Sequence, residues 1–110
     1  MANKPVINVV ITECPPEAEA KFNKWYNEVH IPILFKFKGM KRVTRYKLLK
    51  EPGGNPTFMA IYDFENRQAF EEFSKSPELA AARAEMQETW KGGFQITSRA
   101  QYEFLRAWQK

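Results

Sequence analysis

Apolar and polar positions along this chain change period from one segment to the next, and the changes mark the expected elements. Residues 5–12 read PVINVVIT, a nearly continuous β-branched run that is typical of a strand covered on both faces. Residues 17–30 instead carry apolar side chains at helical spacing, and Pro16 suits the first turn of a helix. The expected buried face of this helix consists of Phe22, Trp25, Tyr26, Val29 and Ile33.

The end of this first helix is predicted from a proline. Pro32 disfavours the helical conformation for Ile31, so we expect the regular helix to end or kink near His30. A short turn over residues 33–37 is compatible with the sequence that follows.

A hairpin is predicted next. Residues 40–49 read MKRVTRYKLL and residues 57–64 read TFMAIYDF, and both are rich in residues that favour strands. Between them, EPGGNP at 51–56 is the strongest turn signal of the chain. The two strands should therefore pair.

The last third of the chain predicts a broken helix and a final strand. Asn66 is suited to cap a helix that runs to Ser74, and Ser76 with Pro77 is suited to begin another that carries Trp90 and is ended by the glycines at 92–93. The segment 94–108 begins with apolar and polar residues in alternation. One side of this strand is expected to carry Phe94, Ile96, Ser98, Ala100, Tyr102 and Phe104.

The order strand, helix, strand, strand, helix, strand is the split βαβ pattern of ferredoxin-like domains. We therefore predict one α+β domain over residues 1–110, with a four-stranded antiparallel sheet and helices on one face. The strands carry apolar residues on both faces, whereas the helices cover only one. A second copy of the chain is the expected cover, giving a homodimer paired sheet to sheet about a twofold axis.

Composition and charge narrow the class of protein. The 110 residues are 44% hydrophobic and 27% charged, as expected of one globular domain. No apolar run approaches the roughly 20 residues of a membrane span. Met1–Lys4 leads straight into a strand pattern rather than a signal peptide, and Cys14 has no partner for an internal disulfide. We expect a soluble, cytoplasmic protein. The net charge of +4 comes from scattered basic residues, densest over 36–50, which favours solvated surface or attraction of an anionic ligand over nucleic-acid binding.

Two stretches carry a resemblance to a known family. FNKWYNEVHIP, at 22–32, combines an aromatic pair with His30 and Pro32, and KGMKRVTRYKLL, at 38–49, places a glycine before a strand. With the element order of essentially the whole chain, they resemble the EthD-like family of the dimeric α+β barrel superfamily. The resemblance implies a dimer of ferredoxin-like subunits. It also implies one of several chemistries, from cofactor-free oxygenases, isomerases, cyclases, dehydratases and decarboxylases to some heme enzymes.

His30, the only histidine, is the first candidate for chemistry because its ordinary pKa lies near neutrality. It lies at the flank of the apolar helix face, one turn after Tyr26, so an imidazole and a phenol are expected to meet one substrate. Tyr26 is the candidate hydrogen-bond donor, or simply a packed aromatic residue. A helix end favours the imidazolium and burial favours the neutral ring. The alternative role for His30 is a hydrogen bond to backbone that holds the following turn.

The remaining candidates would line a pocket between the first helix and the sheet. Phe22, Trp25 and Trp90 are candidate aromatic walls, with packing as their default role. Arg45 is a candidate clamp for a carboxylate or enolate, although a solvated strand charge is the more usual role. Arg45 and the next residue, a tyrosine, face opposite ways, so at most one points under the helices. Asn8 interrupts an apolar strand and is a candidate polar contact.

Residue types that are scarce also bear on function. The chain has one histidine, one cysteine and no spaced carboxylate cluster, which argues against a protein-built metal site. The glycines at 53–54 precede no predicted helix, so they do not indicate a phosphate-binding loop. We predict a cofactor-independent enzyme of the lyase, dehydratase or isomerase type, with His30 as general acid or base. Its substrate would be an apolar or aromatic metabolite with a carbonyl or phenol group. A cofactor-free monooxygenase and a non-catalytic protein that binds a hydrophobic metabolite remain alternatives.

Overall fold

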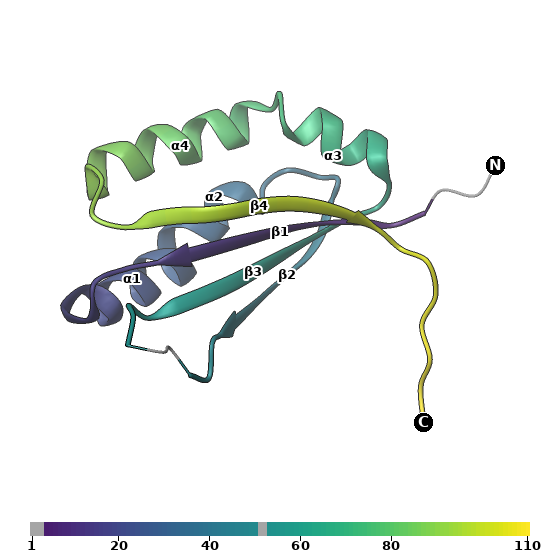
Figure 1. Cartoon of the computed structure of the whole chain (residues 1–110). Coiled ribbons are helices and arrows are strands. Elements are labelled where there is room, and N and C mark those ends of the chain that lie inside the picture. Colours follow the sequence, from purple (N-terminus) through teal and green to yellow (C-terminus); the bar gives the residue numbers. More distant parts are fainter. Residues whose placement is uncertain (1–3, 51–52) are drawn as a thin grey trace.

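Figure 1 shows the computed structural model of the chain, in which helices cover one face of a four-stranded sheet. The structure describes residues 4–50 and 53–110. Met1–Asn3, which precede the first predicted strand, and Glu51–Pro52, from the predicted turn, lie outside the described residues. No helix in the described part of the chain is long and apolar enough to cross a membrane.

The sheet has the strand order β2-β3-β1-β4, and every neighbouring pair is antiparallel. The central strands β1 (Val6–Glu13) and β3 (Thr57–Phe64) pair over their whole length. The outer strands are β2 (Met40–Lys47) and β4 (Gln95–Glu103). This topology confirms the predicted ferredoxin-like fold and the predicted pairing of β2 with β3.

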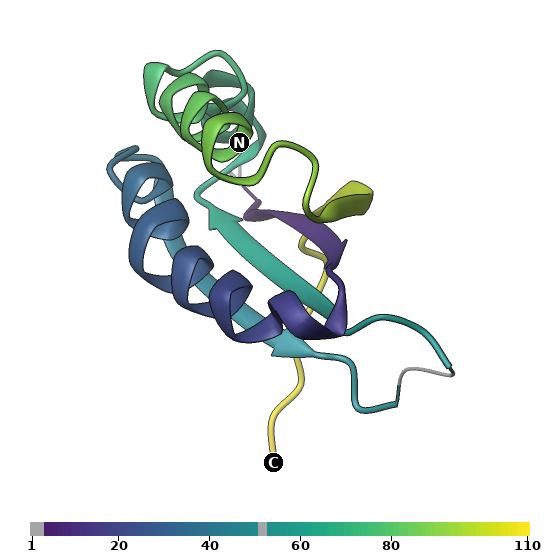
Figure 2. The same cartoon turned by 90° about the vertical axis from the view of Figure 1, so that its left-hand side faces the viewer.

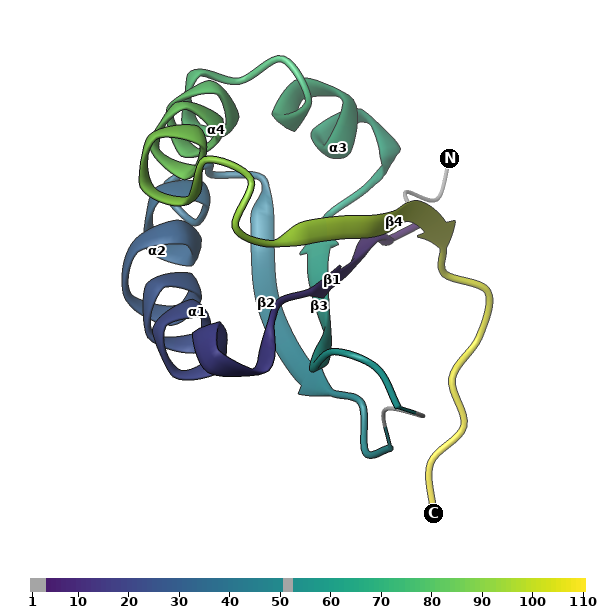
Figure 3. The same cartoon turned by 60° about the vertical axis from the view of Figure 1, so that its left-hand side comes forward.

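The helical layer is built from two stretches of chain that lie on the same side of the sheet (Figures 2 and 3). The first stretch consists of a 3-10 turn η1 (Pro16–Ala18), helix α1 (Glu19–Trp25), a π-helical turn η2 (Tyr26–His30) and helix α2 (Ile31–Leu34). The second consists of α3 (Arg67–Phe73) and α4 (Pro77–Trp90), and α4 packs against α2.

Side-chain caps begin both helices of the second stretch, as predicted. The Asn66 side chain accepts a hydrogen bond from the Ala69 N–H at 2.9 Å, and the Ser76 hydroxyl accepts one from the Leu79 N–H at 3.1 Å. Each cap satisfies a helical N–H that has no partner within the helix. α4 ends at Trp90, and the next residue, Lys91, adopts a left-handed conformation with φ of 47°.

The expected departure from helix at Ile31 is wrong. Ile31 has helical φ and ψ of −61° and −45°, and its N–H donates to the carbonyl of Tyr26, five residues earlier. A proline ring inside an α-helix presses against the carbonyl four residues back. The π turn inserts one extra residue immediately before Pro32 and widens the helix there, so the chain stays helical through the proline.

The same π turn changes which residues are buried. One extra residue rotates the following side chains by about 100° around the helix axis. His30 and Leu34 therefore continue the buried face that begins with Phe22 and Tyr26, whereas Val29, predicted to be buried, is 36% exposed.

A second irregularity, in β4, corrects the predicted facing of that strand. Ile96 lies opposite Thr12 on the helix-covered face, but Ser98 lies opposite Ile11 on the open face, because an extra residue between them shifts the register. Beyond this β-bulge, Arg99 and Gln101 face the helices and Ala100 and Tyr102 do not. The predicted single face for alternate residues from Phe94 onward is therefore wrong.

The two faces of the sheet have different surroundings. Most of the buried core lies between the helices and the sheet, centred on Phe22, which has no exposed surface. The other face carries partly exposed apolar side chains from the central strands and no helix: Ile7, Val9, Ile11, Met59 and Ile61. Residues 104–110 follow β4 and run away from the sheet (Figure 1).

Candidate functional site

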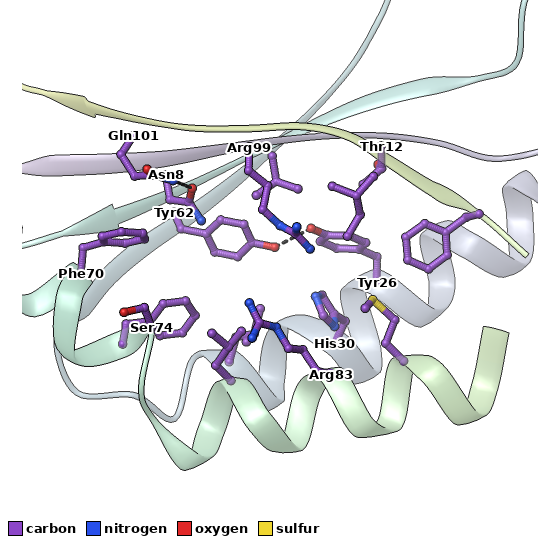
Figure 4. A pocket seen from close by; sticks show the side chains of 17 residues that line it. Asn8, Thr12, Tyr26, His30, Tyr62, Phe70, Ser74, Arg83, Arg99 and Gln101 are labelled. Carbon is purple, nitrogen blue, oxygen red and sulfur yellow. Dashed lines mark hydrogen bonds between the residues drawn. The ribbon is translucent and has the colours of Figure 1, made fainter. Parts of the chain in front are cut away.

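A cavity of about 120 Å³ lies between the sheet and the helices, toward the α3 end of the domain. Engineered cavities of about this size hold a single benzene ring. Its walls are largely apolar and come from β1, η2, α2, β3, α3, α4 and β4 (Figure 4). Its polar lining residues are Asn8, Thr12, Tyr26, His30, Tyr62, Ser74, Arg83, Arg99 and Gln101.

His30 lines this cavity as a buried, neutral imidazole. Its ring stacks on the Trp25 indole, with ring centroids 4.7 Å apart, and lies edge-on to the Tyr26 ring at 4.9 Å. Burial lowers the pKa of His30 from 6.5 to about 4; the charge of Glu85 acts against this shift and that of Arg45 adds to it. The imidazole is therefore uncharged throughout the physiological range.

No hydrogen bond holds the His30 ring within residues 4–50 and 53–110, and its Nδ1 atom is buried without a partner. The predicted alternative, a histidine tied to backbone at the end of the helix, is thus not what the structure shows. His30 is left with a hydrogen-bonding capacity that only a ligand or water in the cavity can use.

Tyr26 forms half of a buried pair of phenols. Its hydroxyl and that of Tyr62, on β3, share a hydrogen bond, and both side chains are buried. Burial raises the pKa of Tyr26. Burial also raises the pKa of Tyr62, and the negative charge of an ionised Tyr26 would raise it further by repelling the charge of an ionised Tyr62. Both hydroxyls are therefore protonated near neutrality. One of the two protons bridges the pair, and the other remains available to a third oxygen.

Arg45 faces the helix side of the sheet but lies outside the cavity lining. Its guanidinium lies 4.4 Å from the centroid of the Tyr26 ring and donates hydrogen bonds of 2.9 Å to the side-chain oxygens of Asn23 and Asn27. Tyr46 faces the opposite way, as predicted, and is 56% exposed. In this position Arg45 orients the Tyr26 ring; a direct contact of Arg45 with ligand stays a prediction.

The three predicted aromatic walls lie beside the cavity rather than on its lining. Phe22, Trp25 and Trp90 pack against one another, with ring centroids 5.6–6.1 Å apart. Trp25 also donates a 2.9 Å hydrogen bond to Glu85, which joins α1 to α4. Their packing fixes the helix that carries His30.

Asn8 does line the cavity. Its side chain is buried, and its Oδ1 accepts a 2.9 Å hydrogen bond from Gln101 on the neighbouring strand. The amide pair places polar groups at the end of the cavity away from Tyr26 (Figure 4).

Several cavity residues were missed by sequence reasoning. Tyr62 was the one polar-tipped side chain at a buried position of an apolar strand, which is a signal that was available. The bulge in β4 reverses the expected facing of Arg99 and Gln101, so strand alternation did not predict them at the cavity. Arg83 lies on α4, and no spacing of residues along that helix distinguishes it. In the part of the chain that the structure describes, no three His, Cys, Asp or Glu side chains gather as metal ligands would.

Several solved structures share this architecture. An ethyl tert-butyl ether D (EthD) family protein from Bacillus halodurans superposes with a TM-score of 0.68, at 14% identity over 91% of this chain and 99% of that one. A protein from Shewanella loihica described as a proposed monooxygenase has a TM-score of 0.60 and 17% identity, over 97% and 100% of the chains. A dimeric ferredoxin-like protein from an uncultured marine organism has a TM-score of 0.61 and 9% identity, over 94% and 98%.

The predicted resemblance to EthD-like and dimeric α+β barrel proteins is thus confirmed as a likeness of fold. In sequence, residues 6–103 match the family described as a domain of unknown function, DUF4286, and the chain belongs to that family. No curated protein matches the chain in sequence.

Proposed function

We propose that this protein is a cofactor-independent enzyme that moves a proton on a small apolar or aromatic molecule with a carbonyl or phenol group. The observation that carries the proposal is the neutral, unpartnered imidazole of His30, which shares a cavity with the Tyr26–Tyr62 hydroxyl pair. A base and a hydrogen-bond donor that face one small apolar space are the minimum equipment for proton transfer at carbon.

The proposed step begins with the neutral imidazole. A nitrogen of His30 takes a proton from the carbon next to a carbonyl, and the electron pair of the C–H bond moves onto the carbonyl oxygen. The free proton of the Tyr26–Tyr62 pair hydrogen-bonds the resulting enolate oxygen. Returning the proton to a different carbon gives isomerisation. Giving it instead to a departing β-hydroxyl, which leaves as water, gives dehydration.

Burial serves both partners in this step. It keeps both tyrosines protonated as donors, and it makes the His30 imidazolium unstable until a negative charge forms beside it. An enolate supplies that charge, so the pKa of His30 rises as the proton is transferred. The apolar walls keep water from weakening this pairing of charges.

Hydrogen–deuterium exchange at carbon tests the proposal before any natural substrate is known. A panel of small aryl ketones, β-dicarbonyl compounds and phenols is first screened for binding by ligand-observed NMR. Those that bind are then incubated in D₂O, and deuterium uptake at carbon is followed by NMR. We expect catalysed exchange in at least one of them, and a loss of 10²-fold or more in His30→Gln, the range that general bases supply.

The matched control is Glu28→Gln, an exposed neighbour of His30 on the same turn, which should leave exchange unchanged. Each variant is checked for an unchanged circular-dichroism spectrum and ligand affinity. Exchange that survives His30→Gln would contradict the assigned base. Binding by several compounds with exchange in none would favour a non-catalytic binding protein.

A cofactor-free monooxygenase is the second candidate, favoured by the fold shared with the proposed monooxygenase from Shewanella loihica. In such a reaction the same base would first ionise a phenol, and the electron-rich anion would then reduce dioxygen. Oxygen uptake measured with bound phenols, without added flavin or metal, separates the two candidates. Uptake that depends on both the phenol and His30 would favour the monooxygenase.

We also propose that two copies pair through the open face of the sheet. The partly exposed apolar residues on that face, Val9, Met59 and Ile61 among them, would be buried by a twofold pairing. The dimeric ferredoxin-like protein of similar fold supports this arrangement. Sedimentation at micromolar concentration should show a species of twice 12.9 kDa, and Ile61→Asp should shift it to the monomer. A wild-type protein found only near 12.9 kDa would contradict the pairing.

A further inference from the structure

Two arginines enter the cavity from opposite sides. Arg99 projects from β4, where the bulge turns it toward the helices, and Arg83 projects from α4. In Figure 4 the Arg99 guanidinium lies near the hydroxyls of Tyr26 and Tyr62, and the Arg83 guanidinium lies beside His30, on the side of Ser74. Neither residue was singled out by the sequence, and neither has a role in the proton transfer proposed above.

Both arginines lack a protein partner. In the described part of the chain, Arg42 pairs with Asp63, and Arg67 pairs with Glu103, but Arg83 and Arg99 have no ion pair and no hydrogen bond. Among residues 4–50 and 53–110, no aspartate or glutamate lines the cavity. Because His30 is neutral there, the cavity has two positive charges and no negative one. Such a site attracts anions and disfavours cations.

We infer that the ligand of this cavity is a small aromatic or alicyclic carboxylate, whose carboxylate is held by Arg83 and Arg99 at the cavity mouth. The inference rests on the proposed function and narrows its substrate class. A planar guanidinium donates two parallel hydrogen bonds to a carboxylate, which fixes the orientation of the ring as well as its charge. The apolar walls then receive the ring, and the carbonyl or phenol oxygen points to the Tyr26–Tyr62 pair.

The size of the cavity agrees with this occupant. A volume of about 120 Å³ suits one ring with short substituents.

Matched uncharged ligands test the inference. The probes are benzoate and 4-hydroxybenzoate against benzamide and 4-hydroxybenzamide, with affinities measured by ligand-observed NMR or calorimetry at low salt. We expect each acid to bind at least 10-fold more tightly than its amide. The preference should shrink at high salt, because the arginines are exposed at the mouth. It should fall several-fold in Arg99→Gln and in Arg83→Gln, and disappear in the double variant.

Arg42→Gln is the matched control, since it removes the same charge from an exposed position outside the cavity. The preference for acids should survive that change. Equal affinity for acid and amide in the wild type, or a preference that persists in the double variant, would overturn the inference. These outcomes are independent of the proposed proton transfer, because affinity is measured with His30 intact. If the protein catalyses exchange on neutral ketones but does not bind acids more tightly than amides, the proposed function stands. Only the inference that the ligand is a carboxylate is then refuted.

Discussion

Between the helices and the sheet, one end of the core is filled by packed aromatic rings and the other end contains the cavity. We call them the solid end and the hollow end, and the same helix and strands border both. At the solid end, the rings of Trp25, Phe58, Trp90 and Phe94 surround Phe22, with centroids 4.9–6.1 Å from it. At the hollow end, polar-tipped side chains hydrogen-bond in pairs and leave a cavity between the pairs. Interlocking rings fill space, whereas paired polar groups hold their positions and resist collapse.

Tyr26 forms the boundary between the two ends. Its ring lies 5.4 Å from Phe22 on one side and 4.9 Å from His30 on the other, and its hydroxyl reaches Tyr62. The solid end thus fixes the tyrosine ring, and the hollow end uses its hydroxyl. A substitution at either end should therefore have a characteristic effect, mainly on stability at one and mainly on ligand at the other.

The largest effect is expected at the centre of the solid end. Phe22→Ala removes a ring with no exposed surface and leaves a void among five other aromatic rings. The free energy of unfolding should fall by about 3–5 kcal/mol, a large share of the stability of a domain of this size. Urea denaturation measures it, with Phe22→Leu as the milder control. A loss below about 1 kcal/mol would show that the solid end is not the stabilising one.

The next effect belongs to the hollow end and depends on pH. The pKa of His30 is about 4 in the folded protein and 6.5 when unfolded, so only the unfolded chain takes up a proton between these values. Above pH 6.5, His30 adds no pH dependence to the free energy of unfolding. That free energy falls as the pH drops from 6.5 toward 4. The loss should reach about 2 kcal/mol between pH 7.5 and pH 5.

Comparison with His30→Leu isolates this contribution, because the carboxylates titrate in both proteins. The variant should lose less stability on acidification than the wild type does. Since His30 is the only histidine, its Cε1–H resonance is also assigned without ambiguity. An NMR titration midpoint at pH 6 or above would contradict the buried, neutral imidazole.

Much of the solid end could be predicted from sequence, because it follows from regular periodicity. Helical spacing identified Phe22 and Trp25, and the Asn66 and Ser76 caps marked the start of the later helices. Strand patterns and the turn between them gave the order of elements. Regular elements leave regular patterns, so the fold could be predicted without knowing its irregularities.

The hollow end depends on two irregularities that spacing does not reveal. The π turn exchanges Val29 for His30 on the buried face, and the bulge in β4 turns Arg99 toward the helices. Each inserts a single residue into a regular element, and the choice depends on packing with distant parts of the chain. Helical spacing placed Tyr26 on the buried face and His30 only at its flank, so His30 was singled out by residue type and by resemblance, whereas Arg99 could be found only from the structure.

The smallest effect is expected at the hydroxyl pair. Tyr62→Phe and Tyr26→Phe each leave one buried hydroxyl without its partner, at a cost of about 1 kcal/mol, because water in the cavity can replace the lost hydrogen bond. The double variant removes both polar groups and should cost less than the sum of the two single changes. Urea denaturation of all four proteins gives this cycle directly. Additive losses would show that the two hydroxyls act separately, and a coupled loss would show that the boundary between the solid and hollow ends is held by their shared hydrogen bond.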